Sequence, residues 1–460
     1  MIKLGCARRD ITPDFPVPMA GYFCKDRFSE GIHDRLHARA LAFLSDDKPF
    51  VLLQLDLLCL DACCVERLRE AIGRFGLSKD SLLVCCIHTH SGFGGMLDTA
   101  DGINREMVPL YGAYDQTVAG FLIERCLDAV GAAVADARKT PEGGPDGGNT
   151  VRIRIGRGSV KGLATNRHDP ASPCDDGLFL VEFLKADGKK ILLYNLCCHP
   201  TVLNAHNRFI SADFPGAVAA LLESPGSVDP DAYDMVLFVN GSAGDMSTRF
   251  TRKESGFAEC ERFGALVQKA ITETIGQGGE FEALEEARLE YRSVALTRVE
   301  VPAPEAAEQR LAEMRKNLEQ TKKNTADPRL VRKAESFVEG AEISLIKARY
   351  PRRGDDVSVE TGLLTLNGQK ILCVPLELFS SLALRRENLV FFGYANALLG
   401  YLADREAYDA MDYEALFSEF AMGEGERYIE MLSDVINTVC IEQSTNVPAN
   451  TDFNKIVFNR

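Results

Sequence analysis

The apolar run Leu82–Ile87 constrains the fold of this chain more than any other stretch. Six consecutive apolar residues bounded by polar ones predict a strand that is buried on both faces. His88 and His90 follow the run directly, and side chains two residues apart in an extended segment point to the same side. The two imidazoles can therefore share one metal ion. A simple hydrogen-bonded pair of histidines is the alternative interpretation.

The same arrangement, an apolar run followed by a residue with useful chemistry, recurs three times along the chain. The runs and their followers are Lys190–Cys198 with His199, Met235–Val239 with Asn240–Asp245, and Lys370–Leu376 with Glu377. In open α/β sheets the ligand crevice lies beyond the carboxyl ends of the strands. The pattern therefore predicts one shared site at the ends of four core strands.

Length and composition favour one large domain. The chain has 460 residues, and no Pro- or Ser-rich linker divides it. We expect a single catalytic domain over residues 1–460, of the α/β class, with a mixed central β-sheet flanked by helices. Residues 302–352 are rich in Ala, Glu, Lys, Arg and Leu, which predicts a charged helical hairpin inserted in this domain. The hairpin is either a solvent-facing decoration or a contact in a homo-oligomer.

Charge and cysteine usage limit the possible partners. The formal net charge of −15 argues against nucleic acid and gives no polybasic face for an anionic membrane. No apolar run reaches the roughly 18 residues of a transmembrane segment. The 14 cysteines lie mostly in apolar runs or as adjacent pairs without a C-x-x-C spacing, and the N-terminus has no export signal. We therefore expect a cytoplasmic protein without thiolate-bound zinc, acting on a small molecule.

Several separated stretches, taken together and in order, resemble the neutral/alkaline non-lysosomal ceramidase family. The resemblance covers the catalytic N-terminal domain of that family, and we expect a short form without the C-terminal immunoglobulin-like domain. The matching stretches are Asp10–Pro13, Ala20–Tyr22, Gly31–Asp34, Leu55–Leu58, His88–Gly92, Asn166–Arg167, Cys198–Thr201, Ser211–Asp213, Gly244–Ser247, Pro375–Leu378, Gly393–Asn396, and Gly400–Tyr401 followed by Tyr413.

The resemblance implies a Zn²⁺ site with four ligands, namely His88, His199, Glu377 and Tyr401. Three of these four, His88, His199 and Glu377, also follow predicted core strands, which is independent of the resemblance. Two imidazoles, a carboxylate and a phenol oxygen leave room for a water molecule, which zinc acidifies for attack on a carbonyl carbon.

The resemblance also implies residues that act on the substrate. Gly21, Arg167 and Tyr413 match substrate-binding positions, and His90 matches a position that contacts the amide and can stabilise an oxyanion. Ser247 matches a catalytic serine, either as nucleophile or by positioning water. To these we add Asp245, a possible orienting group or proton acceptor in the same loop, whereas locally a turn glycine and a solvated arginine remain the alternatives for Gly21 and Arg167.

Two further acids have more than one interpretation. Asp56 lies within an apolar run, where it either orients a metal-bound histidine or forms a salt bridge with Arg35 or Arg39. Asp213 either caps the helix that follows it or supports the site.

These observations predict a zinc-dependent hydrolase that cleaves a carboxylic amide, with an N-acyl lipid such as ceramide as substrate, as in sphingolipid metabolism. One alternative is a cytosolic zinc hydrolase of a small polar ester, lactone or amide. The other is a metal-containing binding protein without turnover.

Overall fold

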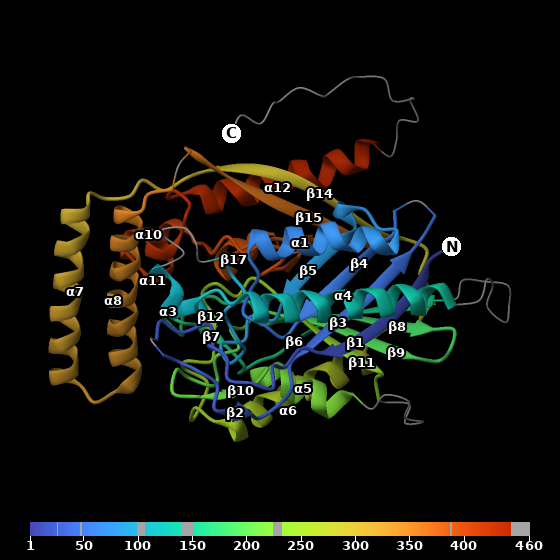
Figure 1. The fold of residues 1–460 in the computed structure, drawn as a ribbon, viewed down its shortest axis with the longest axis horizontal. Coiled ribbons are helices and arrows are strands. Elements are labelled where there is room, and N and C mark those ends of the chain that lie inside the picture. Colours follow the sequence, from blue (N-terminus) through green and yellow to red (C-terminus); the bar gives the residue numbers. More distant parts are fainter. Residues whose placement is uncertain are drawn as a thin grey trace.

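The computed structural model describes residues 1–24, 26–46, 48–98, 106–139, 151–223, 232–352, 354–386 and 389–442. It contains helices and sheets in layers, which confirms the predicted mixed α/β class (Figure 1). The strands divide among three larger sheets and three two-stranded pairs. Within the described residues, no helix has both the length and the apolar character needed to cross a membrane.

The first sheet has the strand order β1-β3-β4-β5. Its strands are Lys3–Asp10, His37–Leu44, Phe50–Leu55 and Leu82–Cys86. Strand β5 is the predicted strand of the histidine motif, and it pairs in parallel with β4. The long helix α4, Gln116–Lys139, packs along β1 and β3 and covers one face of this sheet (Figure 1).

The second sheet has the order β11-β9-β8-β6-β13. Its strands are Met235–Asn240, Lys190–Leu196, Gly177–Lys185, Val151–Ser159 and Glu282–Ala283. Strands β9 and β11 run in parallel, so that the residues following them leave the same edge of the sheet. Helices α5, Asp213–Leu222, and α6, Phe257–Gly276, pack against each other and against this sheet.

Alternation along the strands sorts their side chains between two apolar cores. Leu41 and Phe43 of β3 share one core with Phe179 and Val181 of β8, so one face of each sheet contributes to it. The intervening residues of the same strands belong to a second core, which also contains the apolar faces of α4, α5 and α6. This two-residue period is that of a strand with both faces buried, and it explains the near-continuous apolar runs in the sequence.

The third sheet and a helical hairpin come from the C-terminal part of the chain. The sheet order is β14-β15-β16-β18, with strands Ala287–Thr297, Asp356–Leu366, Gln369–Cys373 and Val390–Phe392. Between β14 and β15 the chain forms α7, Pro304–Asn324, and α8, Pro328–Arg349, which project at one side of the molecule (Figure 1). Helix α8 packs on α11, Tyr413–Phe417.

Short pairs of strands position the loops between the sheets. They are β17, Glu377–Leu378, with β19, Tyr401–Leu402; β12, Met246–Ser247, with β7, Thr165–Asn166; and β10, Phe209–Ile210, with β2, Gly31–Ile32. The remaining helices are α1, Ala62–Ala71, followed by the 3-10 turns Ile72–Phe75 and Lys79–Ser81, then α3, Val108–Tyr111, α9, Ser380–Ala383, α10, Arg405–Ala410, and α12, Glu424–Glu442.

Candidate metal centre

The ends of β5 and β9 and the short strand β17 bring His88, His199 and Glu377 together. The ring centroids of His88 and His199 are 4.7 Å apart. Glu377 Oε2 lies 3.2 Å from Nε2 of each histidine. All three side chains are buried. We call these three residues the acceptor centre.

Backbone carbonyl groups fix the orientation of both imidazoles. Nδ1 of His88 lies 3.0 Å from the carbonyl oxygen of Leu58, and Nδ1 of His199 lies 2.7 Å from that of Ala243. A carbonyl oxygen can only accept, so each Nδ1 carries the hydrogen and donates it. Nε2 of each ring is then the atom left to bind a ligand, as is usual for metal-bound histidines.

The charges at the acceptor centre favour a cation. Burial, followed by the charge of Arg167, lowers the pKa of His199 to about 3, so its imidazole is neutral near pH 7. A carboxylate therefore faces two imidazole lone pairs, and Nε2 of His88 has no hydrogen-bond partner among the described residues. This donor set fits a divalent metal ion.

His90 extends the cluster on one side. Ligand atoms of His88, His90 and His199 all lie within 4.8 Å of one another, so these histidines can hold a metal. Both ring nitrogens of His90 are shielded from solvent and lack a hydrogen-bond partner within the described part of the chain. Gly21 lies directly against this ring: with a φ of +104°, a Cβ atom there would be 2.6 Å from His90 Cγ. Gly21 is therefore needed for the close approach to His90.

Tyr401 and Arg167 lie together beside the acceptor centre. Parallel pairing of β17 and β19 places Tyr401 opposite Glu377. The Tyr401 hydroxyl accepts a hydrogen bond from Arg167 Nη1 at 3.4 Å, while Nη2 lies 2.8 Å from both ring nitrogens of His199. Arg167 is buried, so the alternative of a solvated arginine is wrong.

Ser247 and Asp245 lie in the loop that carries β12. Ser247 forms a backbone bridge with His199, and its Oγ accepts a hydrogen bond from the backbone N–H of Arg249 at 3.3 Å. The carboxylate of Asp245 accepts hydrogen bonds from Ser380 N and Oγ, at 2.6 and 2.9 Å, and from Asn166 Nδ2 at 3.1 Å. Burial raises the pKa of Asp245 to about 6. These contacts orient the loop.

Tyr413 and two unpredicted residues complete the surroundings of Arg167. The Tyr413 ring is 5.9 Å from that of Tyr401. Its neighbour Glu414 is buried and accepts hydrogen bonds from Arg167 Nη1 at 2.8 Å and from His168 Nε2 at 2.7 Å. Burial alone would raise the pKa of Glu414, but the contacts with His168 and Arg167 have a larger, opposite effect and lower the pKa to about 2. Buried acids need such partners, but neither the acid nor its pairing has a local signal in the sequence.

Another unpredicted residue is Tyr394, whose ring centroid is 4.2 Å from that of His88. It has a φ of +54°, a conformation in which few non-glycine residues are found. The sequence gives only the stretch Gly393–Asn396 as part of the family resemblance and does not indicate this contact.

The structure also decides between the alternatives for two acids. Asp56 accepts hydrogen bonds from Arg39 Nη1 at 2.8 and 2.9 Å, so it forms the salt bridge and does not contact His88. Asp213 is the first residue of α5, and the N-cap is Ala212, so the prediction that Asp213 caps this helix is wrong. Its carboxylate accepts hydrogen bonds from the backbone N–H groups of Phe214, Leu203 and Val202. It therefore joins the helix start to the loop after His199.

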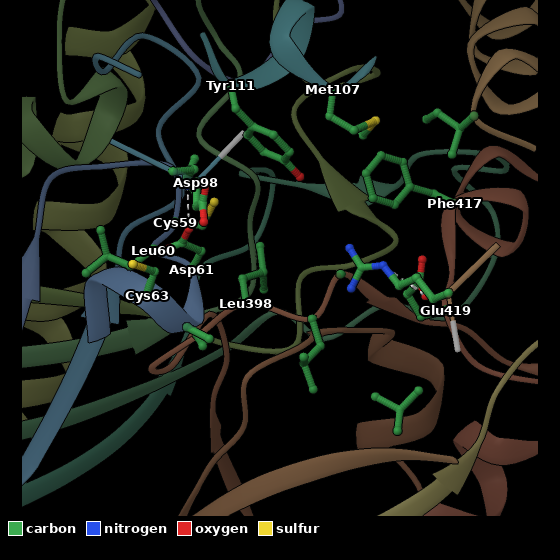
Figure 2. A pocket seen from close by; sticks show the side chains of 18 of the residues that line it. Cys59, Leu60, Asp61, Cys63, Asp98, Met107, Tyr111, Leu398, Phe417 and Glu419 are labelled. Carbon is green, nitrogen blue, oxygen red and sulfur yellow. Dashed lines mark hydrogen bonds and ion pairs between the residues drawn. The ribbon is translucent and has the colours of Figure 1, made fainter. Parts of the chain in front are cut away.

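A cavity of about 380 Å³ lies near Tyr401, and none of the three residues of the acceptor centre lines it. Its wall includes Gly400, the neighbour of Tyr401, and Phe417, whose ring is 5.6 Å from that of Tyr401. Figure 2 shows the side chains of Tyr111 and Phe417 directed toward this space, with Glu419 at one end. The volume lies within the range of roughly 300–1,000 Å³ that is common for small-molecule sites.

The fold is mixed α/β, and histidines at the ends of its strands are able to hold a metal. These two features define the class of protein. Within this class, the model of the family described as neutral/alkaline non-lysosomal ceramidase, N-terminal, matches residues 2–297. The chain belongs to this family.

Curated relatives agree with the family match. The chain is 25% identical over 281 residues to the neutral ceramidase of Mycobacterium tuberculosis, covering 54% of this chain and 40% of that protein. It is 26% identical over 240 residues to neutral ceramidase 2 of Arabidopsis thaliana, covering 48% of this chain and 30% of that protein. The chain therefore matches less than half the length of these relatives.

Solved structures agree on the fold. The neutral ceramidase from Pseudomonas aeruginosa superimposes with a TM-score of 0.72 at 19% identity, covering 98% of this chain and 76% of that chain. A structure of a ceramidase complexed with C2 gives a TM-score of 0.71 at 17% identity, with 98% and 77% covered. At these identities the likeness concerns the fold alone.

Proposed function

We propose that this protein is a zinc-dependent hydrolase that cleaves a carboxylic amide of an N-acyl, ceramide-like substrate. The observation that carries the proposal is the acceptor centre, in which a carboxylate faces Nε2 of two oriented imidazoles at 3.2 Å. Membership of the ceramidase family and the names of the relatives support amide hydrolysis as the reaction.

In this proposal His88, His199 and Glu377 hold the zinc ion, and Tyr401 is the fourth ligand. His90 can bind in the same cluster or act on the substrate, since its nitrogens lie within 4.8 Å of the ligand atoms of His88 and His199. Bound zinc supplies Lewis acidity, which lowers the pKa of water and polarises a carbonyl group.

The other residues would bind and orient the substrate. Arg167 is a fixed cation because Glu414 holds its guanidinium, so it can donate hydrogen bonds to the amide oxygen as negative charge develops there. The neutral ring of His90 can donate a hydrogen bond to the same oxygen or receive a proton. Ser247 either attacks the carbonyl carbon or positions water, and Asp245 keeps its loop in place through Ser380 and Asn166.

The substrate's acyl chain would lie in the cavity near Tyr401. Apolar and aromatic side chains form much of its wall, among them Met107, Ile343, Ile346, Val357 and Leu398. An aliphatic chain buried there leaves water, at about 25 cal/mol per Å² of apolar area. This cavity favours an N-acyl substrate over a small polar ester or lactone, and a cytoplasmic location remains a prediction.

The test is hydrolysis of a matched panel of fluorogenic substrates by the full chain. The panel contains N-acyl amides of increasing chain length, the corresponding esters, and lactones, each with and without a zinc chelator. We expect chelator-sensitive turnover of the amides, with kcat/KM rising as the chain lengthens. Turnover confined to short polar esters would instead support the small-substrate hydrolase, and no turnover across the panel would support the binding protein.

A further inference from the structure

One end of the cavity gathers three cationic side chains around a single carboxylate. Glu419 Oε2 lies 2.7 Å from Arg298 Nη1 and 3.7 Å from Arg352 Nε, and Glu419 Oε1 lies 3.9 Å from Lys347 Nζ. All four residues line the cavity, and Figure 2 shows Glu419 at one end of it. We call them the basic end. It holds three positive charges against one negative charge, in a chain whose net charge is −15.

Lys347 contributes a buried cation to this end. Its ammonium group donates hydrogen bonds to the carbonyl oxygens of Leu416, at 3.2 Å, and Ser418. Burial lowers the pKa of Lys347 to about 8; the carboxylate of Glu419 raises it, and the charges of Arg352 and Arg298 lower it. Three cations thus lie within 4 Å of one carboxylate at the basic end.

Among the described residues that line the cavity, only those of the basic end carry positive charge. The middle of the cavity is formed by apolar side chains, including Met107, Ile343, Val357 and Phe417. At the opposite side, the carboxylate of Asp61 is occupied by the backbone N–H groups of Cys64 and Asp98, at 2.8 and 2.7 Å. An amphiphile in this cavity would thus meet positive charge at one end only.

We propose that the cavity binds an aliphatic chain that ends in a carboxylate, with the carboxylate at Arg298, Lys347 and Arg352 and the chain against the apolar wall. Arginine recognises carboxylates through paired N–H donors, and a ligand carboxylate would share the two guanidinium groups with Glu419. None of the residues of the acceptor centre lines this site. Binding of a free fatty acid does not depend on the proposed hydrolysis, whereas binding of an acyl substrate rests on it. The carboxylate belongs either to a free fatty acid or to the far end of an acyl substrate.

Calorimetric titration of the full chain with decanoate and with decan-1-ol tests the proposal. The two probes have the same chain and differ in the charge of the head group. We expect decanoate to bind at least about tenfold more tightly, since a charge-assisted pair replaces a neutral contact. Equal affinities for the two probes would overturn the proposal.

Three variants locate the carboxylate. Arg298→Met should weaken decanoate binding by about tenfold, and Arg352→Met by about threefold because Arg352 is more exposed. Neither change should alter the affinity for decan-1-ol. The matched control is Arg349→Met, on the same helix as Lys347, since Arg349 pairs with Glu308 and does not line the cavity. Decanoate affinity that is unchanged in both cavity variants would contradict the assignment.

A variant that fills the cavity provides a second test in case the arginine variants do not fold. Ile346 lies on α8 in the cavity wall, and Ile346→Trp should abolish binding of both probes while the melting temperature stays near that of the parent. If either probe still binds normally, the chain does not occupy this cavity.

The source of the carboxylate is decided by a separate comparison. If the natural ligand is a free fatty acid, decanoate should bind or inhibit. Turnover should then show no preference among the substrates. An acyl substrate predicts faster turnover of N-acyl amides with an ω-carboxylate than of those with a methyl end, and loss of this preference in Arg298→Met. Because binding is measured without turnover, failure of the hydrolase proposal would leave the titration result interpretable.

Discussion

The acceptor centre and the basic end are two regions of opposite charge. At the acceptor centre, Oε2 of Glu377 lies 3.2 Å from Nε2 of His88 and of His199, and Nδ1 of each ring donates to a backbone carbonyl group. At the basic end, three cations share the carboxylate of Glu419. Buried groups that only accept call for a cation, and buried cations in excess call for an anion. From this difference in charge we infer that each region binds a ligand.

The largest effect is expected from Glu377→Gln. The side-chain amide can donate a hydrogen bond to one Nε2, and it removes the negative ligand. We expect kcat/KM to fall by about a thousandfold, roughly 4 kcal/mol of lost transition-state stabilisation. The melting temperature of the metal-free protein should rise, and the further rise caused by added zinc should disappear. The control Glu124→Gln changes an exposed acid on α4 and should leave all three quantities unchanged.

Glu414→Gln should have the next largest effect, because it leaves Arg167 without its buried counter-ion. Breaking a buried ion pair on one side typically costs about 3–5 kcal/mol, and we expect about 3 kcal/mol here because glutamine keeps an acceptor. Denaturant unfolding measures this loss, and kcat/KM should also fall about tenfold as Arg167 shifts. If stability and activity match those of the exposed control Glu406→Gln, then Glu414 does not anchor Arg167.

A smaller effect, dependent on pH, is expected from His168→Gln. Contact with Glu414 and Asp412 outweighs burial and raises the pKa of His168 above 6.5. A raised pKa in the folded state stabilises the protein fully below 6.5 and loses this contribution as pH rises through the folded value. The pKa of Glu414 is lowered to about 2, so its contribution is present above about 4.5 and is lost toward pH 2.

The free energy of unfolding of the parent minus that of His168→Gln should therefore be largest between about pH 4.5 and 6.5 and should shrink toward pH 9. Urea unfolding at pH 5.5 and pH 9 measures the two values. A difference that grows with pH would contradict the proposed ion pair.

The smallest effect is expected from Glu419→Gln. This change removes the carboxylate that competes with a ligand for Arg298, so decanoate should bind about threefold more tightly. The protein should also be less stable, since three cations lose their shared anion. Weaker decanoate binding in a folded variant would show that Glu419 is itself part of the ligand site and would break the comparison between the two regions.

The sequence predicts those parts of the structure whose pattern lies in consecutive residues. The runs that form β5, β9, β11 and β16 are predicted because strands buried on both faces need consecutive apolar residues. The strands that carry His88 and His199 and the short strand that contains Glu377 belong to three different sheets, so the meeting of these residues depends on the packing of the sheets as well as on the runs. By contrast, β14 has charged residues among its apolar ones, and only its pairing with β15 over eleven residues defines it.

The basic end has no signal of this kind. The four residues come from separate parts of the chain: Arg298 follows β14, Lys347 lies on α8, Arg352 follows α8, and Glu419 follows α11. They therefore meet only through the packing of the hairpin and the third sheet. The sequence predicts no chemistry in the hairpin, because a charged helical surface is ordinarily solvated. The tertiary structure places part of that surface in a cavity.

Elemental analysis of the purified full chain, after equilibration with zinc and removal of the excess, tests the central claim most directly. We predict about one zinc ion per chain, and loss of that zinc in the double variant His88→Ala/His199→Ala while circular dichroism shows an unchanged fold. A parent protein that retains no zinc, or a folded double variant that retains all of it, would contradict the account.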